Sequence, residues 1–363
     1  MSAAGGPTPR PEGCAVRLAW LLHLGLAAAA LVAYLSPYVA PGALWPVAFA
    51  ALAYPSTLLA LVLVGGFWVY RGRPRRALVS VAVVALGYGH LRELVGFGGP
   101  GGEGVAFATY NLLGGRAFAD LDDEALASRA AELAACLGAD VVALQESPRY
   151  ARIADAIDSA FAAAGLAYAY RPGGPYLTLH SRFPLRDRRV VEAYNELNGV
   201  LRADVLAGGG DTVRVLAAHL ESNRVRLDAG QVARDVAQAD PRAYRTLRGV
   251  AANYRLGARR RGAQAAALAA EARASPYPVV VLGDLNDVPL SYALGTLRRA
   301  GLADAFREAG RGFGVTYEGS VPGLRIDYVL ASEELAPLRA SVLACDFSDH
   351  RPTRATLATP GGS

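Results

Sequence analysis

The chain lacks lysine altogether, so all 37 of its Lys or Arg residues are arginine. Arginine binds phosphate through paired hydrogen bonds, and a net charge of +5 is compatible with a phosphate-binding surface. However, the sequence is biased towards Ala, Arg and Gly throughout, and modest basicity does not identify a nucleic-acid-binding protein. The charge therefore does not select a class of substrate.

Cysteine is scarce. Cys14, Cys136 and Cys345 form no CxxC pair and are odd in number, so the sequence indicates neither a zinc site nor a disulfide framework. We expect all three to be ordinary thiols. No apolar run precedes Cys14, which argues against a lipoprotein cleavage site and against a removable signal peptide.

Acidic residues are almost absent between residues 15 and 95. Two apolar runs in this region, 18–35 and 47–70, have about the twenty residues that a membrane-spanning helix needs. A third run, 77–91, is shorter and contains Gly87 and Gly89, so it either spans the membrane or lies at its surface. The sequence thus predicts two or three transmembrane helices.

The orientation follows from the arginines at 71–76, which lie in the short loop between the second and third runs. The positive-inside rule places this loop and the N-terminus in the cytoplasm. If the third run spans, the rest of the chain lies outside the cytoplasm, which we favour; if it does not, the rest is cytoplasmic. We expect His23 and His90 to reach the headgroup region without a functional role.

Four segments follow from this pattern: a membrane segment at 1–97, a flexible Gly-rich linker at 98–104, a domain at 105–358 and a tail at 359–363. Within the domain, short runs rich in Val and Leu predict strands buried on both faces. These runs are 105–110, 140–144, 212–218, 279–282 and 325–330. Helical spacing at 125–137 and 259–273 makes the class α/β or α+β with layered sheets.

Short polar motifs stand at or just beyond the ends of apolar runs. They are ThrTyrAsn at 109–111, GlnGlu at 145–146, HisLeuGluSer at 219–222, GlyAspLeuAsn at 283–286, ArgIleAsp at 325–327 and SerAspHis at 348–350. Loops over one rim of a sheet can bring such distant residues into one crevice. Each motif alone fits an ordinary polar turn, but together they supply the carboxylates, imidazoles and amides needed for metal-assisted hydrolysis of a phosphate ester.

The chemistry suggests a role for each residue. Glu146 is the expected main protein ligand of Mg²⁺, and Asp349 is the second candidate ligand. Asp284 would orient or deprotonate the attacking water, and Asn286 would donate to a phosphate oxygen from the same side of an extended segment.

Two further motifs contribute histidines. Asp327 and His350 would form a carboxylate–imidazole pair, in which the carboxylate fixes the tautomer. His219 would donate to a non-bridging phosphate oxygen, although a lone His after a strand is more often structural. The run Arg259 to Arg261 is interpreted as a solvated helix face.

These motifs resemble those of the endonuclease/exonuclease/phosphatase superfamily, over about residues 105–358. GlyAspLeuAsn and SerAspHis are the most specific of them, and the leading apolar helices look like a bacterial membrane-attached branch. The resemblance implies a four-layer sandwich of two mixed sheets with helices outside. It also makes Asn111 a partner of the metal site or a donor to the phosphate, and it favours the catalytic reading of His219.

We therefore expect an α+β protein whose membrane helices anchor a phosphodiesterase that uses Mg²⁺, or Mn²⁺, and activates water for in-line attack. The expected substrate is a phospholipid or another membrane-associated phosphoester. An extracytoplasmic nuclease acting on DNA or RNA is the alternative, and a non-catalytic membrane module is a lesser one. The lipid bilayer is an expected partner; no protein partner is inferred.

Overall fold

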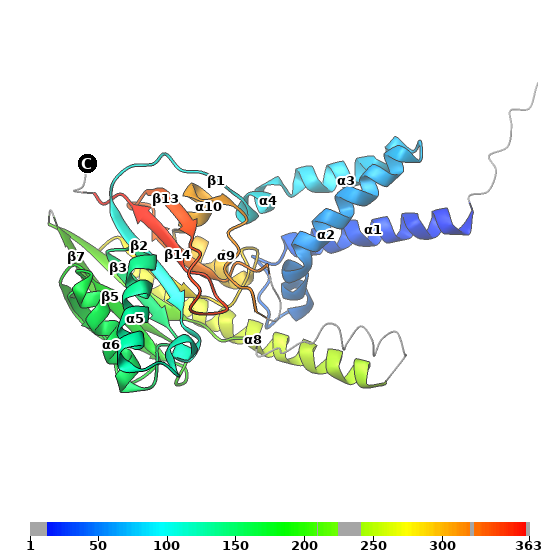
Figure 1. Cartoon of the computed structure of the whole chain (residues 1–363). Helices are drawn as coiled ribbons and strands as arrows, with labels where there is room; N and C mark the ends of the chain where they lie inside the picture. Colours follow the sequence, from blue (N-terminus) through cyan, green and yellow to red (C-terminus); the bar gives the residue numbers. More distant parts are fainter. Residues whose placement is uncertain (1–12, 209, 224–240, 320–322, 361–363) are drawn as a thin grey trace, which may run out of the picture.

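The computed structural model describes residues 13–208, 210–223, 241–319 and 323–360. Within them, two six-stranded sheets form a sandwich, and the N-terminal helices project from one end of it (Figure 1). Both sheets are mixed and helices flank them. The structure thus confirms the predicted α+β class, preceded by apolar helices that could span a membrane.

The first sheet has the strand order β13–β14–β2–β3–β5–β4. Its strands are β2 (Val105–Asn111), β3 (Val141–Gln145), β4 (Tyr168–Tyr170), β5 (Leu177–Ser181), β13 (Pro337–Val342) and β14 (Thr353–Leu357). The neighbours β2 and β3 are parallel, so their carboxyl ends lie at the same edge. The sequence predicts these two central strands but not the other four, whose apolar runs are shorter or more polar.

The second sheet has the order β10–β12–β9–β8–β7–β6. Its strands are β6 (Leu185–Ala193), β7 (Gly199–Gly208), β8 (Asp211–His219), β9 (Val279–Asp284), β10 (Leu302–Asp304) and β12 (Asp327–Ser332). Here β8 and β9 are the parallel pair, and β12 runs antiparallel beside β9. The start of β12 therefore lies at the same edge as the ends of β8 and β9.

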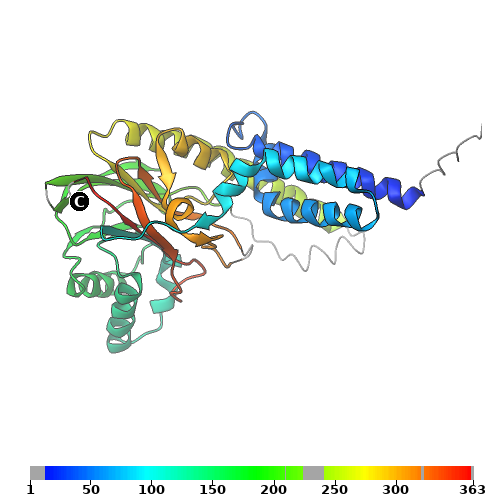
Figure 2. The ribbon, with the colours of Figure 1, turned by 90° about the horizontal axis from the view of Figure 1, so that it is seen from above.

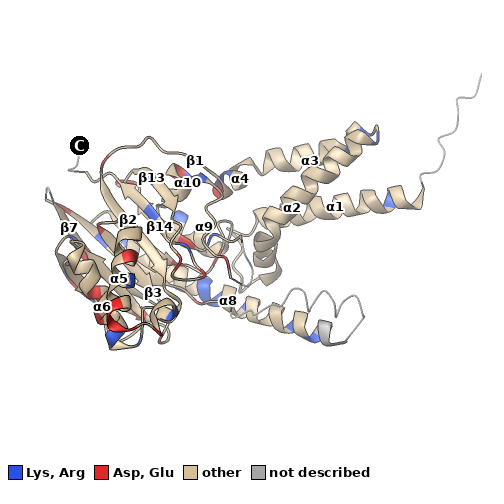
Figure 3. Ribbon diagram, in the orientation of Figure 1, with Lys and Arg blue, Asp and Glu red and all other residues tan. Residues whose placement is uncertain are grey.

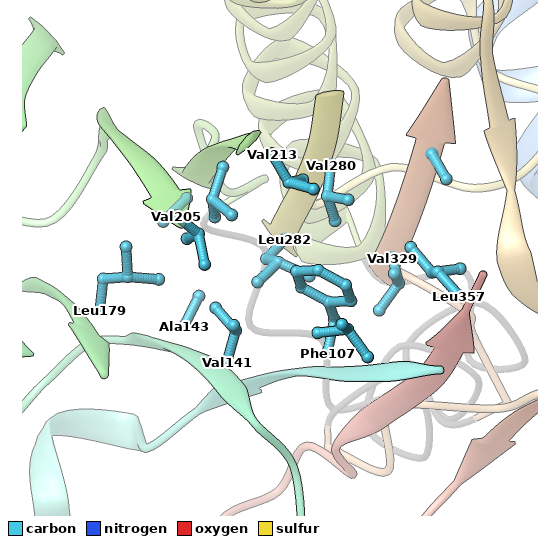
Figure 4. Packing of buried hydrophobic residues seen from close by; sticks show 14 of the residues in the cluster. Phe107, Val141, Ala143, Leu179, Val205, Val213, Val280, Leu282, Val329 and Leu357 are labelled. Atoms are coloured by element: carbon cyan, nitrogen blue, oxygen red, sulfur yellow. The ribbon is translucent and has the colours of Figure 1, made fainter. Parts of the chain in front are cut away.

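Apolar side chains from both sheets meet between them (Figure 4). Phe107, Val141, Val280 and Val329 are fully shielded from solvent there. Burial of such a side chain contributes roughly 1.5–3 kcal/mol, so this layer is a main source of stability. It also holds the two sheets, and hence the loops at their edges, in a fixed relation.

Helices cover the outer faces of the sandwich. The first sheet packs against α5 (Asp123–Leu137) and α6 (Ala151–Ala163), and the second against α8 (Pro241–Arg273) and α9 (Tyr292–Arg298). The remaining short elements are a 3-10 helix η1 (Leu113–Phe118), α10 (Ala305–Ala309) and the two-stranded pair β1 (Gly96–Phe97) with β11 (Arg311–Gly312). Helix α8 starts 18 residues before the predicted 259–273 helix.

The three cysteines are not all thiols. Cys136 on α5 and Cys345 in the segment after β13 form a disulfide, and Cys14 is free and exposed. The prediction of ordinary thiols is therefore wrong for two of the three. The reason is that 209 positions separate the pair in sequence, and only the packing of α5 on the first sheet brings the two sulfur atoms together.

The N-terminal helices are α1 (Cys14–Tyr34), α2 (Trp45–Tyr70), α3 (Pro74–Leu86) and α4 (Tyr88–Leu94). Among the described residues α1 and α2 are long and apolar enough to span a membrane, and α3 with α4 forms a possible third span bent by 63°. Figure 2 shows α1, α2 and α3 side by side, and Figure 3 shows that they carry few charged residues. His23 does not reach a headgroup region as expected, because it is buried and bonds Ser80 Oγ at 2.8 Å between α1 and α3.

The segment 98–104, expected to be a flexible linker, lies against the domain. Gly98 N donates to Gly310 O, and Gly101 N donates to Leu338 O. A Cβ atom at Gly99 or Gly104 would lie within 2.5 Å of a backbone oxygen. Glycine is thus required here for close packing as well as for chain freedom.

Direct contacts also fix the N-terminal helices to the domain. Glu93 on α4 forms ion pairs with Arg298 and Arg307 of the domain. On α8, Tyr254 donates a hydrogen bond to Ala48 O of α2 at 2.8 Å. The domain and the apolar helices therefore share an interface that the sequence did not predict.

Candidate active site

Strand register places three predicted site residues side by side. His219 is the last residue of β8, Asp284 the last of β9 and Asp327 the first of β12. His219 pairs with Asp284 in the β8–β9 ladder, and Asp284 pairs with Asp327 in the β9–β12 ladder. One edge of the second sheet therefore carries an imidazole and two carboxylates in adjacent positions.

The first sheet supplies Asn111 and Glu146 to the same edge. Asn111 ends β2 and donates from Nδ2 to Asp284 Oδ2 at 3.0 Å, which joins the two sheets. Its Nδ2 also lies 3.3 Å from Glu146 Oε1. Because the Leu113 N–H donates to Asn111 Oδ1 at 2.9 Å, the amide group faces the two carboxylates with its nitrogen.

The backbone is unusual at this edge. Leu113, Glu146 and Asn286 have positive φ angles of 50°, 46° and 52°, although none is glycine. Such conformations are uncommon for residues with a side chain and are found often at functional sites. At Glu146 the turn leaves the side chain 25% exposed. Glu146 is therefore the accessible carboxylate beside the buried carboxylates of Asp284 and Asp327.

Two buried histidines flank Asp284. His219 Nε2 lies 3.6 Å from Asp284 Oδ2, and His350 Nε2 lies 3.8 Å from the same oxygen. The other ring nitrogen of His219 contacts Leu197 O at 2.9 Å, which fixes a tautomer with the proton on Nδ1. His219 therefore presents its Nε2 atom to the carboxylates.

The predicted pair of Asp327 and His350 is formed, with His350 Nδ1 at 2.9 Å from Asp327 Oδ2. Burial raises the pKa of the Asp327 carboxyl, against the opposing effect of His350. Burial also acts to lower the pKa of His350, but the carboxylates of Asp327 and Asp284 raise it above its usual value. The neighbouring carboxylates therefore favour the charged imidazole of His350.

The GlyAspLeuAsn segment differs from its expected geometry. Strand β9 ends at Asp284, and the positive φ of Asn286 means that the two side chains do not share one face of an extended segment. Instead Asp284 Oδ1 accepts from Asn286 N, and Asn286 Nδ2 donates to Leu220 O at 3.0 Å. The glycine is required because a Cβ at Gly283 would lie 1.9 Å from Ala218 O.

The carboxylate and imidazole groups that lie closest to one another do not belong to the predicted metal ligands. Among the described residues, one ligand atom from each of Asp284, Asp327 and His350 lies within 4.8 Å of the others. Asp349 contacts Ser348 Oγ at 3.4 Å. The donor set nevertheless fits a hard divalent cation, because three carboxylates gather at this edge and Asp327 Oδ1 has no hydrogen-bond partner in the part of the chain that the structure describes.

Sequence reasoning missed two residues that position this site. Thr316 Oγ1 accepts from the N–H groups of Ile326 and Asp327, and Asn198 Nδ2 donates to Leu220 O. Both residues lie outside the polar motifs at the ends of the apolar runs, so the sequence pattern gave little reason to assign them a role.

Arg261, interpreted as part of a solvated face, is fully buried. It bonds Asp287, Asn223 and the carbonyl of Glu221, and so holds the two segments that follow His219 and Asn286. Its neighbours differ: Arg259 is exposed, and Arg260 is half-exposed and pairs with Glu221. The prediction failed because helix periodicity turns one arginine of the run inward.

Each sheet has a central parallel pair, and carboxylates and histidines gather at one edge of the sandwich. The sequence profile of the endonuclease/exonuclease/phosphatase family matches residues 108–350. The chain belongs to this family, whose members are hydrolases that act on phosphoesters. A profile described as a domain of unknown function (DUF8431) matches residues 16–94, and no curated protein matches the chain.

Several solved structures are similar. Truncated TDP2 from Caenorhabditis elegans is 20% identical, with a TM-score of 0.48 and coverage of 72% of this chain and 100% of the other. Sphingomyelinase C from Streptomyces griseocarneus is 19% identical, with a TM-score of 0.46 and coverage of 71% and 100%. An endonuclease/exonuclease/phosphatase from Beutenbergia cavernae is 20% identical, with a TM-score of 0.46 and coverage of 72% and 73%.

Proposed function

We propose that the protein is a membrane-anchored phosphodiesterase that depends on a divalent metal ion and cleaves its substrate by in-line attack of water on phosphorus. The observation that carries the proposal is the group of Asp284, Asp327 and His350 with ligand atoms within 4.8 Å of one another. Asn111 and His219 lie in contact distance of the same Asp284 carboxylate. This is the residue set that phosphate hydrolysis needs.

In this proposal Glu146 and Asp349 hold the ion, which is Mg²⁺ or Mn²⁺. When bound, the ion would neutralise charge on the phosphate. Asn111 orients the Glu146 carboxylate through its Nδ2 atom; a direct ligand role would require its amide to release the Leu113 N–H and turn.

The remaining residues act on the water and the phosphate. Asp284 Oδ2 is the acceptor for a proton of the attacking water. His350, kept charged by Asp327, donates to the phosphate, and His219 Nε2 lies beside the same carboxylate. One Asn286 Nδ2 proton is already donated to Leu220 O, so only its second proton is free for a phosphate oxygen.

Two observations support an extracytoplasmic position for the catalytic domain. The arginines between α2 and α3 lie at the end of the helix bundle away from the domain (Figure 3), where the positive-inside rule places the cytoplasm. The disulfide between Cys136 and Cys345 is the kind of bond that persists in an oxidising compartment. A reporter that is active only in the periplasm, fused to the C-terminus, tests this position and should be active. Activity of a reporter that works only in the cytoplasm, fused at the same place, would contradict it.

A membrane phosphoester is the substrate we favour. Val288 and Leu290, which follow the GlyAspLeuAsn segment, pack in one apolar cluster with residues of α1 and α2. The catalytic loops thus lie directly against candidate membrane-spanning helices.

The deciding experiment uses the full chain in detergent–lipid micelles. Hydrolysis of phospholipid in the micelles and of supercoiled DNA is measured with Mg²⁺, with Mn²⁺ and with chelator, beside a His350→Ala variant. We expect metal-dependent turnover of the phospholipid that the variant loses. Turnover of DNA alone would establish the nuclease instead, and no turnover with either ion would favour a non-catalytic membrane module.

A further inference from the structure

An apolar cavity of about 280 Å³ lies between α2 and the catalytic loops. One wall is formed by Ala51, Leu52 and Pro55 of α2. The opposite wall includes Val288, Leu290 and Leu324, which belong to loops of the catalytic domain. Its size approaches the range of roughly 300–1,000 Å³ in which small-molecule sites fall, and a smaller apolar cavity of roughly 150 Å³ already takes up hydrocarbon rather than water.

The inner wall is directly connected to the catalytic residues. Val288 is two positions after Asn286, and Arg325 is two positions before Asp327, so each step covers at most about 7 Å of chain. Leu324 also pairs with Tyr317, and Tyr317 in turn pairs with His350 and has its ring 5.0 Å from the imidazole. A ligand in the cavity would therefore have its head end near the site.

The outer wall is connected to the bilayer. Pro55 is the eleventh residue of α2, so the cavity lies within about 15 Å of the helix end nearest the domain. On the same helix Phe49 and Leu59 are exposed large apolar side chains of the kind that face lipid. The cavity thus lies at the level where a lipid chain meets its headgroup.

The lining contains one charged side chain. Arg325 is 4% exposed, and its guanidinium is held by protein groups: Nη2 forms an ion pair with Asp304 Oδ2 at 3.3 Å and donates to Glu93 O. The other residues that line the cavity are apolar or glycine. These walls suit the hydrocarbon chain of an amphiphile.

We infer that this cavity binds the hydrocarbon chain of a membrane lipid whose phosphodiester lies in the active site. The inference rests on the proposed hydrolysis of a membrane phosphoester and names its substrate class. In this arrangement the protein uses its own candidate membrane helix α2 as one wall of the substrate site. A chain held there places the scissile phosphorus beside Asp284 and His350.

The test compares two substrates that share one reaction. Hexadecyl p-nitrophenyl phosphate and ethyl p-nitrophenyl phosphate both lose p-nitrophenolate as water forms the new phosphorus–oxygen bond, and they differ only in the alkyl chain. Ala51→Leu fills the cavity from α2, and Ala28→Leu on the exposed face of α1 is the matched control. All variants are assayed as full chains in the same micelles, after their melting temperatures are compared.

We expect Ala51→Leu to lower kcat/KM at least about tenfold for the hexadecyl ester and less than about twofold for the ethyl ester, with Ala28→Leu changing neither. An equal loss on both esters, or no loss on either, would overturn the inference while leaving the proposed function intact. Failure of the wild-type chain to cleave either ester would instead count against the proposed function.

A second readout does not depend on turnover. Hexadecyl phosphate with a diazirine at the chain end is photolysed with the His350→Ala variant in chelator, and labelled peptides are identified by mass spectrometry. We expect labels at residues 51–55 or 288–290, reduced several-fold by Ala51→Leu. Labels confined to the lipid-facing surfaces of α1 and α3 would refute the cavity as a chain-binding site, even if the esters are cleaved.

Discussion

The disulfide between Cys136 and Cys345 should contribute a large part of the stability of the catalytic domain. The perturbation is the double substitution Cys136→Ala with Cys345→Ala. The two residues are 209 positions apart, and closing a loop of that length removes conformational entropy from the unfolded chain worth about 5 kcal/mol at 25 °C in the chain-entropy treatment. Native contacts of Cys345, which is buried, add to this figure.

For a domain of this size each kcal/mol shifts Tm by roughly 2–4 °C, so the double variant should melt about 10–20 °C below the wild type. The assay is thermal denaturation of the full chain in detergent, with and without reductant. Cys14→Ala is the control because Cys14 is exposed and free, and it should leave Tm unchanged. Reductant should lower the Tm of the wild type but not that of the double variant.

Thiol labelling under denaturing conditions gives an independent check. Without reductant the chain should react at Cys14 alone, and after reduction at all three cysteines. Three reactive thiols before reduction, or a double variant that melts within about 2 °C of the wild type, would refute the reasoning. The first result would also remove one of the two supports for an extracytoplasmic domain.

Three further outcomes are expected. Asp327→Asn should lower kcat roughly 10²–10⁴-fold in steady-state assays with saturating metal, because the amide no longer holds its histidine partner charged; an unchanged kcat would exclude that role. Gly283→Ala should lower Tm and abolish activity, since the new Cβ meets Ala218 O at 1.9 Å, whereas Gly173→Ala, with open space around it, should be silent in both assays. Burial lowers the pKa of His180 to about 3, so the unfolded chain binds a proton that the folded chain does not. The free energy of unfolding should therefore fall by up to about 1.4 kcal/mol per pH unit below about pH 6.5, and His180→Leu should reduce that slope; melting curves from pH 7.5 to 5 that keep the same slope in the variant would contradict this.

Much of the fold could be predicted from the sequence because its signals are local. Central strands such as β2 and β9 are continuous apolar runs. Helix α5 is capped at its start by Asp122, whose side chain accepts from Ala125 N, and at its end by Gly138 in the left-handed conformation. The edge strands carry more polar residues and give a weaker pattern. The first half of α8 is polar on most sides, so its periodicity is also weak.

The site also has features that could be predicted from the sequence and features that could not. The residue types at the ends of the apolar runs predicted His219 and Asp284 as site residues, and the family resemblance added Asn111. The pairing of Asp327 with His350 was predicted from the chemistry of the two side chains. The turn of Asn286 towards Leu220 could not be foreseen, because a positive φ angle depends on the contacts around it.

The sequence by itself determined which residues form the strands β2, β3, β8, β9 and β12, which helices are apolar enough for a membrane and which polar motifs accompany them, since these depend on side chains close together in the chain. Only the tertiary structure decided that Cys136 meets Cys345, that Arg261 turns inward and that α2 borders the catalytic loops. Each of these contacts joins segments far apart in sequence. Such contacts form only after the sheets and helices have packed, and no local pattern of residues records which distant surfaces will meet.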